Sequence, residues 1–578
     1  MNLARFAPQT NFAHAHSRLI LRCAAVLALL VSTGCAVLPA PILIDHANAP
    51  AHTVTCAEWY ASLDRQTDLA GVRDAAAARN PGFPHLRVDR FTASLWDTLP
   101  TAPTGPTDGK TPMRGEANQA ASTAALLERM QRLDLEARRF ELANLPPQAL
   151  AQLQSTVGLP PHPSTLWQRT QDCAQRLTDY TLASPEQRAS LFQRIHVPDD
   201  YATSYRLLGI YALTRYPFAN GIRRFEAERN AVFARAEATP AIQTGSAAPT
   251  RSTSLLLVPP AQPLAAPWST EHLRSMLAPL PQDPFRIPAP TPEQAQQLLA
   301  HFAPSFRLSV QSEDDQPGAL VWRQGSTPDA PDTLEVDTQT PMVYSQVAHT
   351  RYGPHSLLQL VYTLWFPARP VTPGSRIDLL AGKLDGITWR VTLAPDGTPL
   401  VYDTIHPCGC YHMFFPTPSA QAKPAPQPGI EWAFIPQTLP RLTAQQQLVV
   451  HVAAGTHYID RVSVEPAQPA AHAASDPAPH ATQYAWRSYD SLRSLPVAGM
   501  PALPDASKPT HRSIFGPDGF IAGTDRSERF IFWPMGIPRA GAMRQWGKHA
   551  TAFVGRRHFD DATLMEQRFE FDSAHFRP

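Results

Sequence analysis

Residues 387–405 consist of the runs Ile-Thr-Trp-Arg-Val-Thr-Leu and Pro-Leu-Val-Tyr-Asp-Thr-Ile, joined by Ala-Pro-Asp-Gly-Thr. Both runs are rich in β-branched and aromatic residues, and the Asp396-Gly397 pair is typical of a tight turn. The stretch therefore predicts a β-hairpin. Residues 357–366, 448–452 and 457–464 predict further strands. We expect a β-rich domain over residues 291–465, built as a sandwich or a barrel-like sheet.

The chain before this domain has the periodicity of helices instead. Leu126, Met130, Leu133, Ala137 and Phe140 are spaced by four and three residues, as on one buried face of a helix. The same spacing recurs between residues 166 and 180. Antiparallel helices packed on one another would bury both faces, which predicts an all-α domain over residues 56–240.

Residues 205–217 of this helical domain form the most apolar stretch after the N-terminal segment. A helix of this length is too short to cross a bilayer. We expect it to be a buried core helix, and contact with a membrane surface is the alternative.

Proline-rich segments separate the predicted domains, because 61 prolines against 28 glycines favour stiff connectors. We expect an α+β multidomain protein whose last segment mixes short elements, including a strand at 530–533 and a helix at 561–569, and packs on the β-rich domain. The predicted boundaries are an N-terminal signal at 1–34, a tether at 35–55, the helical domain at 56–240, a connector at 241–290, the β-rich domain at 291–465, a linker at 466–481 and the mixed C-terminal segment at 482–578.

The charge balance excludes one class of partner. The chain carries 50 basic and 49 acidic residues, for a formal net charge of +1. A protein that binds nucleic acid needs a basic patch or stripe, and none is visible. We therefore expect no nucleic-acid partner.

The N-terminal segment has the layout of an export signal. Arg5, Arg18 and Arg22 precede a short apolar run at 23–31, and Ser32-Thr-Gly-Cys35 closes it. This segment resembles the signal and lipobox of bacterial lipoprotein precursors. The resemblance implies that Cys35 carries lipid, including palmitate, and that the protein is held at the outer membrane, facing the periplasm. A cleaved, soluble periplasmic protein is the alternative.

Four cysteines remain after Cys23 and Cys35. In an oxidising compartment an even number of cysteines favours disulfides. Cys56 and Cys173 both fall in predicted helices of the helical domain, and we expect a disulfide between them. Such a bridge would close a long loop and stabilise the domain.

His406, Cys408, Cys410 and His412 form the sharpest candidate site, directly after the predicted hairpin. Three interpretations stay open. The cysteines form a local disulfide; or the four side chains bind zinc or copper, which both accept thiolate and imidazole; or the cysteines act as redox-active thiols. Binding one ion would require the chain to bend, because alternate residues of a straight strand lie too far apart.

The sequence contains none of the common catalytic signatures, and Gly541–Lys548 is one residue too long for a phosphate-binding loop. Asp378, Asp385 and Asp403 are candidates for acid–base chemistry, but such carboxylates are common in loops and at strand ends. We expect a lipid-anchored structural or interaction protein of the cell envelope, with an envelope protein as its partner. The alternatives are a metal-binding protein or enzyme with its site at residues 406–412, and a thiol-redox protein.

Overall fold

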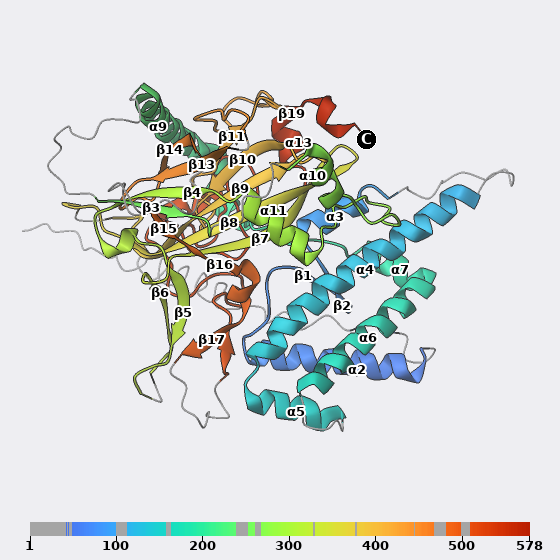
Figure 1. The fold of residues 1–578 in the computed structure, drawn as a ribbon. Helices are drawn as coiled ribbons and strands as arrows, with labels where there is room; N and C mark the ends of the chain where they lie inside the picture. Colours follow the sequence, from blue (N-terminus) through green and yellow to red (C-terminus); the bar gives the residue numbers. More distant parts are fainter. Residues whose placement is uncertain are drawn as a thin grey trace, which may run out of the picture.

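The structure, a computed structural model, confirms an α+β multidomain protein with most helices in the N-terminal part and most strands in the C-terminal part (Figure 1). It describes Ile42, Ile44 and residues 49–99, 113–157, 163–238, 253–260, 268–327, 330–375, 378–443, 445–466, 481–498 and 509–577. The predicted signal, Cys35 and most of the predicted linker at 466–481 lie outside the described residues.

The helical domain is built on long helices that pack around a common core (Figure 1). Leu126, Met130 and Ala137 are buried, as their spacing predicts. A β-hairpin that the sequence analysis missed packs against α4. The elements are α2 (Ala51–Leu69), β1 (Ala78–Asn80), β2 (Phe83–Val88), α3 (Arg90–Trp96), α4 (Met113–Asn144), α5 (Pro147–Val157), α6 (Pro163–Ala183) and α7 (Pro185–Phe192).

Two further helices, α8 (Thr203–Leu208) and α9 (Tyr211–Ala238), follow the helical core. The prediction of a buried core helix at 205–217 is wrong. Leu207, Leu208 and Leu213 are exposed, because α8 and the first half of α9 lie on the surface and bury only part of their apolar residues.

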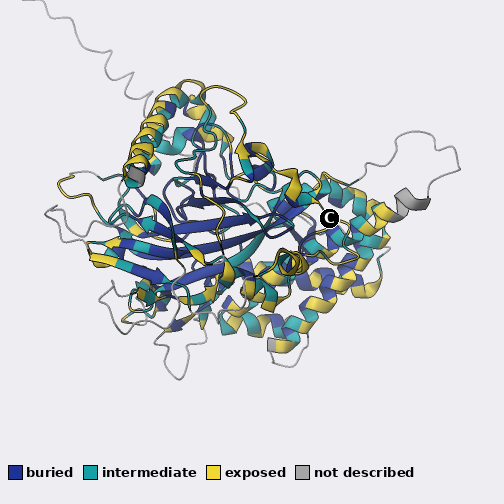
Figure 2. Ribbon diagram, turned by 45° about the horizontal axis from the view of Figure 1, so that its top comes forward, coloured by how far each residue is buried: buried dark blue, intermediate teal, exposed yellow. Residues whose placement is uncertain are grey.

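A six-stranded sheet forms the centre of the β-rich part, in the order β11-β10-β9-β8-β7-β16. The predicted hairpin is confirmed: β9 and β10 pair antiparallel, with Trp389 opposite Thr404, and Gly397 has a φ of 83° in the turn. Almost every residue of β8 and β9 is buried, so both faces of the sheet are covered (Figure 2). The strands are β7 (Met342–Tyr352), β8 (His355–Arg369), β9 (Gly382–Leu393), β10 (Pro399–Ile405), β11 (Met413–Pro416) and β16 (Ala485–Ser488).

A five-stranded sheet, in the order β14-β13-β4-β3-β15, covers one face of the central sheet. Phe306 and Val450 of this sheet share one buried cluster with Leu360 and Trp389 of the central sheet, which makes the pair a β-sandwich. The strands are β3 (Thr253–Val258), β4 (Ser305–Val310), β13 (Gln446–Val452), β14 (Ile459–Pro466) and β15 (Ala481–Gln483). Because β3 pairs with β4, the predicted connector at 241–290 contains a strand of the sandwich.

The C-terminal segment is woven into the β-rich part. It supplies β15 and β16 to the two large sheets, and β17 to a four-stranded sheet in the order β18-β17-β5-β6. The prediction of a strand at 530–533 is wrong, because this stretch folds into α12 and a 3₁₀ turn. The remaining elements are β5 (Ala319–Arg323), β6 (Thr333–Asp337), β12 (Ala420–Ala422), β17 (Leu495–Ala498), β18 (His511–Arg512), β19 (Phe569–Phe571), α10 (Thr270–Met276), α11 (Pro292–His301), α12 (Arg529–Phe532), α13 (Leu564–Arg568), η1 (Glu313–Asp315), η2 (Tyr489–Arg493), η3 (Trp533–Met535) and η4 (Ser573–Phe576).

Within the part of the chain that the structure describes, no helix has both the length and the apolar character that crossing a bilayer requires.

Candidate functional site

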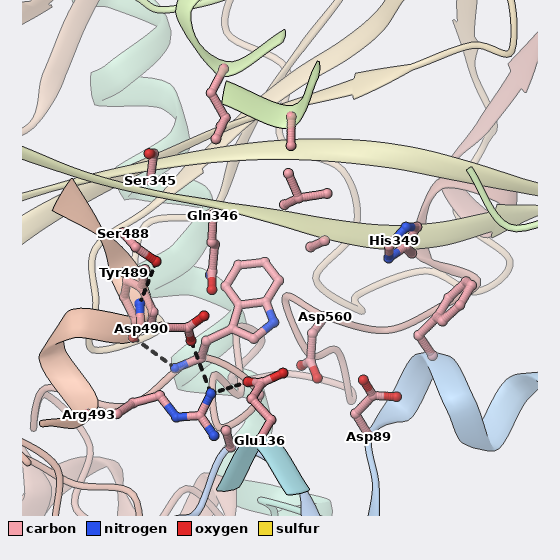
Figure 3. Close-up of a pocket in the computed structure, with 18 of the residues that line it drawn as sticks. Asp89, Glu136, Ser345, Gln346, His349, Ser488, Tyr489, Asp490, Arg493 and Asp560 are labelled. Atoms are coloured by element: carbon pink, nitrogen blue, oxygen red, sulfur yellow. Dashed lines mark hydrogen bonds and ion pairs between the residues drawn. The ribbon is translucent and has the colours of Figure 1, made fainter. Parts of the chain in front are cut away.

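A cleft of about 840 Å³ lies between the helical domain and the β-rich part. Its walls come from α3 and α4 on one side and from β7, β16 and α11 on the other, and the loop at 545–547 and Asp560 complete it (Figure 3). A volume of this size suits a small organic ligand, and domain interfaces are frequent places for such sites. We therefore take this cleft as the candidate functional site.

Aromatic side chains line the cleft and are held by their neighbours. Tyr489 accepts a hydrogen bond at its hydroxyl from the backbone N–H of Trp546 (3.0 Å). The Trp546 ring in turn packs edge-on against Phe559, with 5.7 Å between centroids. Phe91 contributes a further ring, packed against His349 at 5.3 Å. These contacts hold flat apolar surfaces in place on the cleft wall.

Three arginines of the cleft are paired with carboxylates. Arg90 lies 3.3 Å from Asp560, and Arg129 lies 3.8 Å from Asp89. Arg493 pairs with Glu136 and Asp490, as the dashed lines in Figure 3 indicate, and its guanidinium also reaches Asp74 outside the cleft. These three cations have counter-ions, whereas Arg132 and Arg487 also line the cleft and have no carboxylate within 4.0 Å among the described residues.

Other polar atoms of the cleft have no partner. Gln545 is buried, and neither its Nε2 nor its Oε1 has a hydrogen-bond partner among the described residues. Gln346 Nε2 and Trp486 Nε1 are buried and unpartnered in the same way. A buried polar group without a partner costs about 1–3 kcal/mol. These donors and the one acceptor lie in the wall of the cleft but are closed to solvent, so a ligand would satisfy them only after the side chains that cover them shift.

Two titratable groups of the cleft are shifted toward their neutral forms. Burial raises the pKa of Asp560, although Arg90 and His558 act in the opposite direction. Burial and the nearby Arg129 lower the pKa of His349 to about 4, so its imidazole is neutral at pH 7. His349 Nε2 lies 3.2 Å from the Pro288 carbonyl and donates to it, which leaves Nδ1 as an acceptor.

The structure places the predicted cluster at 406–412 in the turn between β10 and β11, outside the lining of this cleft. The chain does bend there, since the His406 N–H donates to the Cys410 carbonyl (3.0 Å) and Gly409 has a φ of 90°. The two histidines nevertheless face different carboxylates. His406 Nδ1 lies 3.1 Å from Asp385, and His412 Nε2 lies 2.9 Å from Asp403.

Each of these two carboxylates has a second partner. Asp403 forms a bidentate ion pair with Arg390, at 2.9 and 2.5 Å. Asp385 also accepts from His457 Nδ1 at 2.9 Å. Asp378, the third predicted carboxylate, accepts from backbone N–H groups of its own turn, such as that of Leu380 at 2.9 Å. All three carboxylates are therefore engaged in holding local structure.

Within the described residues, no group of three or more His, Cys, Asp or Glu side chains is arranged to hold a metal ion. Cys408 and Cys410 are not joined to each other, and the Cys410 N–H donates to Cys408 Sγ at 3.4 Å. Elsewhere, the Sγ atoms of Cys56 and Cys173 lie 2.14 Å apart and form a disulfide between α2 and α6, the pairing that the sequence analysis expects.

The residues of the cleft carry no recognisable motif in the sequence. Gln545 and Trp546 lie within Gly541–Lys548, a stretch that the analysis considered only as a phosphate-binding loop. No helix begins in that stretch, so the phosphate-loop geometry is absent there. The adjacent Gln545-Trp546 pair was the one feature of the sequence that could have indicated a ligand site. This pair does not indicate that Gln346 and Asp560 line the same cleft.

Comparison with protein-family models, with curated proteins and with solved structures finds no match to this chain.

Proposed function

We propose that this chain is a lipid-anchored protein of the cell envelope that binds a hydroxyl-rich ligand, such as an oligosaccharide, in the cleft. The proposed ligand rests on one observation, the buried Gln545 amide. Both ends of this amide lack a hydrogen-bond partner, and Gln545 lines the cleft of about 840 Å³. The location rests on the resemblance of residues 32–35 to a lipobox.

The chemistry of the cleft favours a sugar over other ligands. An amide with a free donor and a free acceptor matches two neighbouring hydroxyl groups. The carboxylates of Asp89, Glu136 and Asp560 can accept hydrogen bonds from further hydroxyls of the ligand. The partly exposed Trp546 ring matches the apolar face of a pyranose ring, while the Tyr489 ring is buried against Phe515.

Binding is tested by titrating the purified protein with soluble β-linked oligosaccharides, such as cellotetraose and chitotetraose, in a calorimeter. We expect binding that Gln545→Ala weakens by about ten-fold, as for the loss of hydrogen bonds worth about 1.5 kcal/mol. Glu128→Ala, an exposed change on the same domain, should leave the affinity unchanged. Absence of binding by the whole panel would contradict the proposed ligand.

The anchor is tested separately. Palmitate labelling should be lost in Cys35→Ser, and the fraction of the protein that resists extraction from membranes by high salt should fall. A wild-type protein that takes up no palmitate and is recovered in the soluble fraction would leave a soluble exported protein as the better description.

Thiol-redox chemistry is a second candidate, favoured by one observation. Cys408 and Cys410 are both free, and the buried Arg544 guanidinium, which has no carboxylate within 4.0 Å among the described residues, is near both sulfurs. A thiolate there would supply the counter-ion that a buried cation needs, although the Cys408 hydrogen bond and burial raise the pKa of Cys410 well above its usual range and outweigh Arg544. If the pair is redox-active, alkylation followed by mass spectrometry should label Cys408 or Cys410 in the folded protein, while Cys56 and Cys173 stay protected by their disulfide.

A further inference from the structure

The corner between α8 and α9 exposes an unusual number of large apolar side chains. Leu207 is 75 % exposed, Leu208 76 %, Ile210 59 %, Leu213 66 % and Tyr216 59 %. Single exposed apolar residues are ordinary, but a contiguous group of this kind marks an interaction surface.

The neighbouring α12 extends the same surface. Phe530 is 68 % and Ile531 47 % exposed. Tyr205 of α8 packs edge-on against Trp533 with 6.1 Å between centroids, and Phe218 of α9 packs against Phe532 at 5.5 Å, so the three helices lie together. We call the exposed apolar side chains at this place the apolar corner: Tyr205, Leu207, Leu208, Ile210, Leu213, Tyr216, Phe530 and Ile531.

The apolar corner is rigidly held by contacts on its inner side. Arg206 Nε donates to the Met535 carbonyl at 2.8 Å, and its guanidinium also reaches the Gly555 carbonyl at 2.5 Å. Gly209 packs so closely on Pro534 that an added Cβ would lie 2.5 Å from the proline Cβ. Ile210 follows with a φ of 48°, a strained conformation for a β-branched residue. The fold therefore fixes these apolar side chains in an outward position.

The charge around the corner points to one kind of partner. Residues 201–225 contain four arginines, at positions 206, 215, 223 and 224, and no aspartate or glutamate. Of these, Arg215 lies two positions after Leu213 and is partly exposed, and Arg223 and Arg224 are exposed about 15 Å further along α9. Protruding leucine and tyrosine side chains flanked by arginines are the composition of a surface that enters a membrane interface and meets anionic headgroups.

We propose that the apolar corner inserts into the interface of a phospholipid bilayer that contains anionic lipid. Such surfaces bury their apolar side chains about 5–10 Å deep, at the boundary between headgroups and acyl chains. The contact is separate from the acyl chain expected on Cys35. It would orient the body of the protein on the membrane, whereas an acyl chain alone tethers without orienting.

The first test is vesicle flotation with full-length Cys35→Ser, which lacks the acylation site. Vesicles of phosphatidylethanolamine and phosphatidylglycerol are used as the probe. Adding Leu207→Ser, Leu208→Ser and Leu213→Ser should lower the apparent vesicle affinity by at least about ten-fold, since three buried leucines are lost. The matched control adds Leu69→Ser, which changes a leucine 77 % exposed on α2 and should have no effect.

The second test reads insertion directly and does not depend on the N-terminal segment, which is the same in every variant. A fluorescent amino acid replaces Leu208 in one protein and Leu69 in another. Brominated lipid should quench the fluorophore at 208 and leave the one at 69 unquenched.

Equal flotation of the triple-serine variant together with no quenching at 208 would overturn the proposal. Light scattering that shows a dimer lost in the triple-serine variant, with no vesicle binding, would also overturn it and assign the surface to a second copy of the chain.

Discussion

Two polar regions of this molecule lie close together and differ in whether their buried polar groups have partners. In the helical domain, Arg87 and Arg138 face Asp134 and Glu141, and all four side chains are fully buried. The guanidinium groups donate at 2.6–3.1 Å, so two positive and two negative charges compensate each other. In the cleft, Gln545 is buried with both ends of its amide unpartnered. Buried polar groups that pair with one another hold the fold, whereas a buried polar group without a partner is a candidate for ligand binding.

The largest effect should come from breaking the ionic cluster. Asp134 accepts from Arg87, Arg138 and the Tyr60 hydroxyl, the last at 3.1 Å. Asp134→Ala leaves buried positive charge uncompensated and should lower the free energy of unfolding by about 3–5 kcal/mol. Urea denaturation measures this. Glu128→Ala, on the exposed side of α4, should change it by less than about 0.5 kcal/mol. Equal effects of the two changes would refute the role of the cluster.

Removal of the disulfide tests how much the covalent link between α2 and α6 stabilises the helical domain. Cys56 and Cys173 are separated by 117 positions in the sequence. The double variant Cys56→Ser, Cys173→Ser should lose about 3 kcal/mol, because the unfolded chain regains the freedom of a long loop. Thermal unfolding under oxidising conditions measures the loss. A wild-type protein that melts at the same temperature with and without reductant would argue against the bridge.

His558, two residues before Asp560 of the cleft, provides a pH-dependent test. Burial alone would lower its pKa, but the carboxylates of Asp199 and Asp561, at 3.3 and 3.4 Å, raise it to about 9. A pKa above the unfolded value of about 6.5 means that the stabilisation is complete below pH 6.5 and is lost as the pH rises through 9.

His558→Gln should therefore lower the free energy of unfolding by about 2 kcal/mol at pH 6 and by much less at pH 9.5. Denaturation of both proteins at the two pH values checks this. A difference that is constant across pH would show that packing, and not charge, accounts for the effect.

The smallest effect has the opposite sign. Gln545→Met removes an unpartnered buried amide and keeps a side chain of similar size, so it should raise the free energy of unfolding by about 1 kcal/mol. The same change should weaken oligosaccharide binding. Loss of stability in Gln545→Met would mean that the amide serves the fold, and the contrast between the two regions would fail.

Much of the fold could be predicted because its signals are local. The spacing of Leu126, Met130 and Ala137 is a property of one helix, and the Asp396-Gly397 turn is a property of one hairpin. Predictions failed where the neighbours of a segment decide its state. The stretch at 530–533 has a strand-like composition, yet it packs as a helical turn beside α8 and α9. The apolar run at 205–217 has a core-like composition, yet no element covers its outward side among the described residues.

By itself, the sequence determined the separation into a helical and a β-rich part, the strands that pair through short turns, and the cysteines available for bridging. Only the tertiary structure decided that His406 and His412 face different carboxylates, that Gln545, Gln346 and Asp560 line one cleft, and that the leucines of α8 are exposed. The reason is physical. Periodicity and turn chemistry depend on neighbouring residues, whereas burial, pairing and cavity lining depend on segments hundreds of positions apart in the sequence.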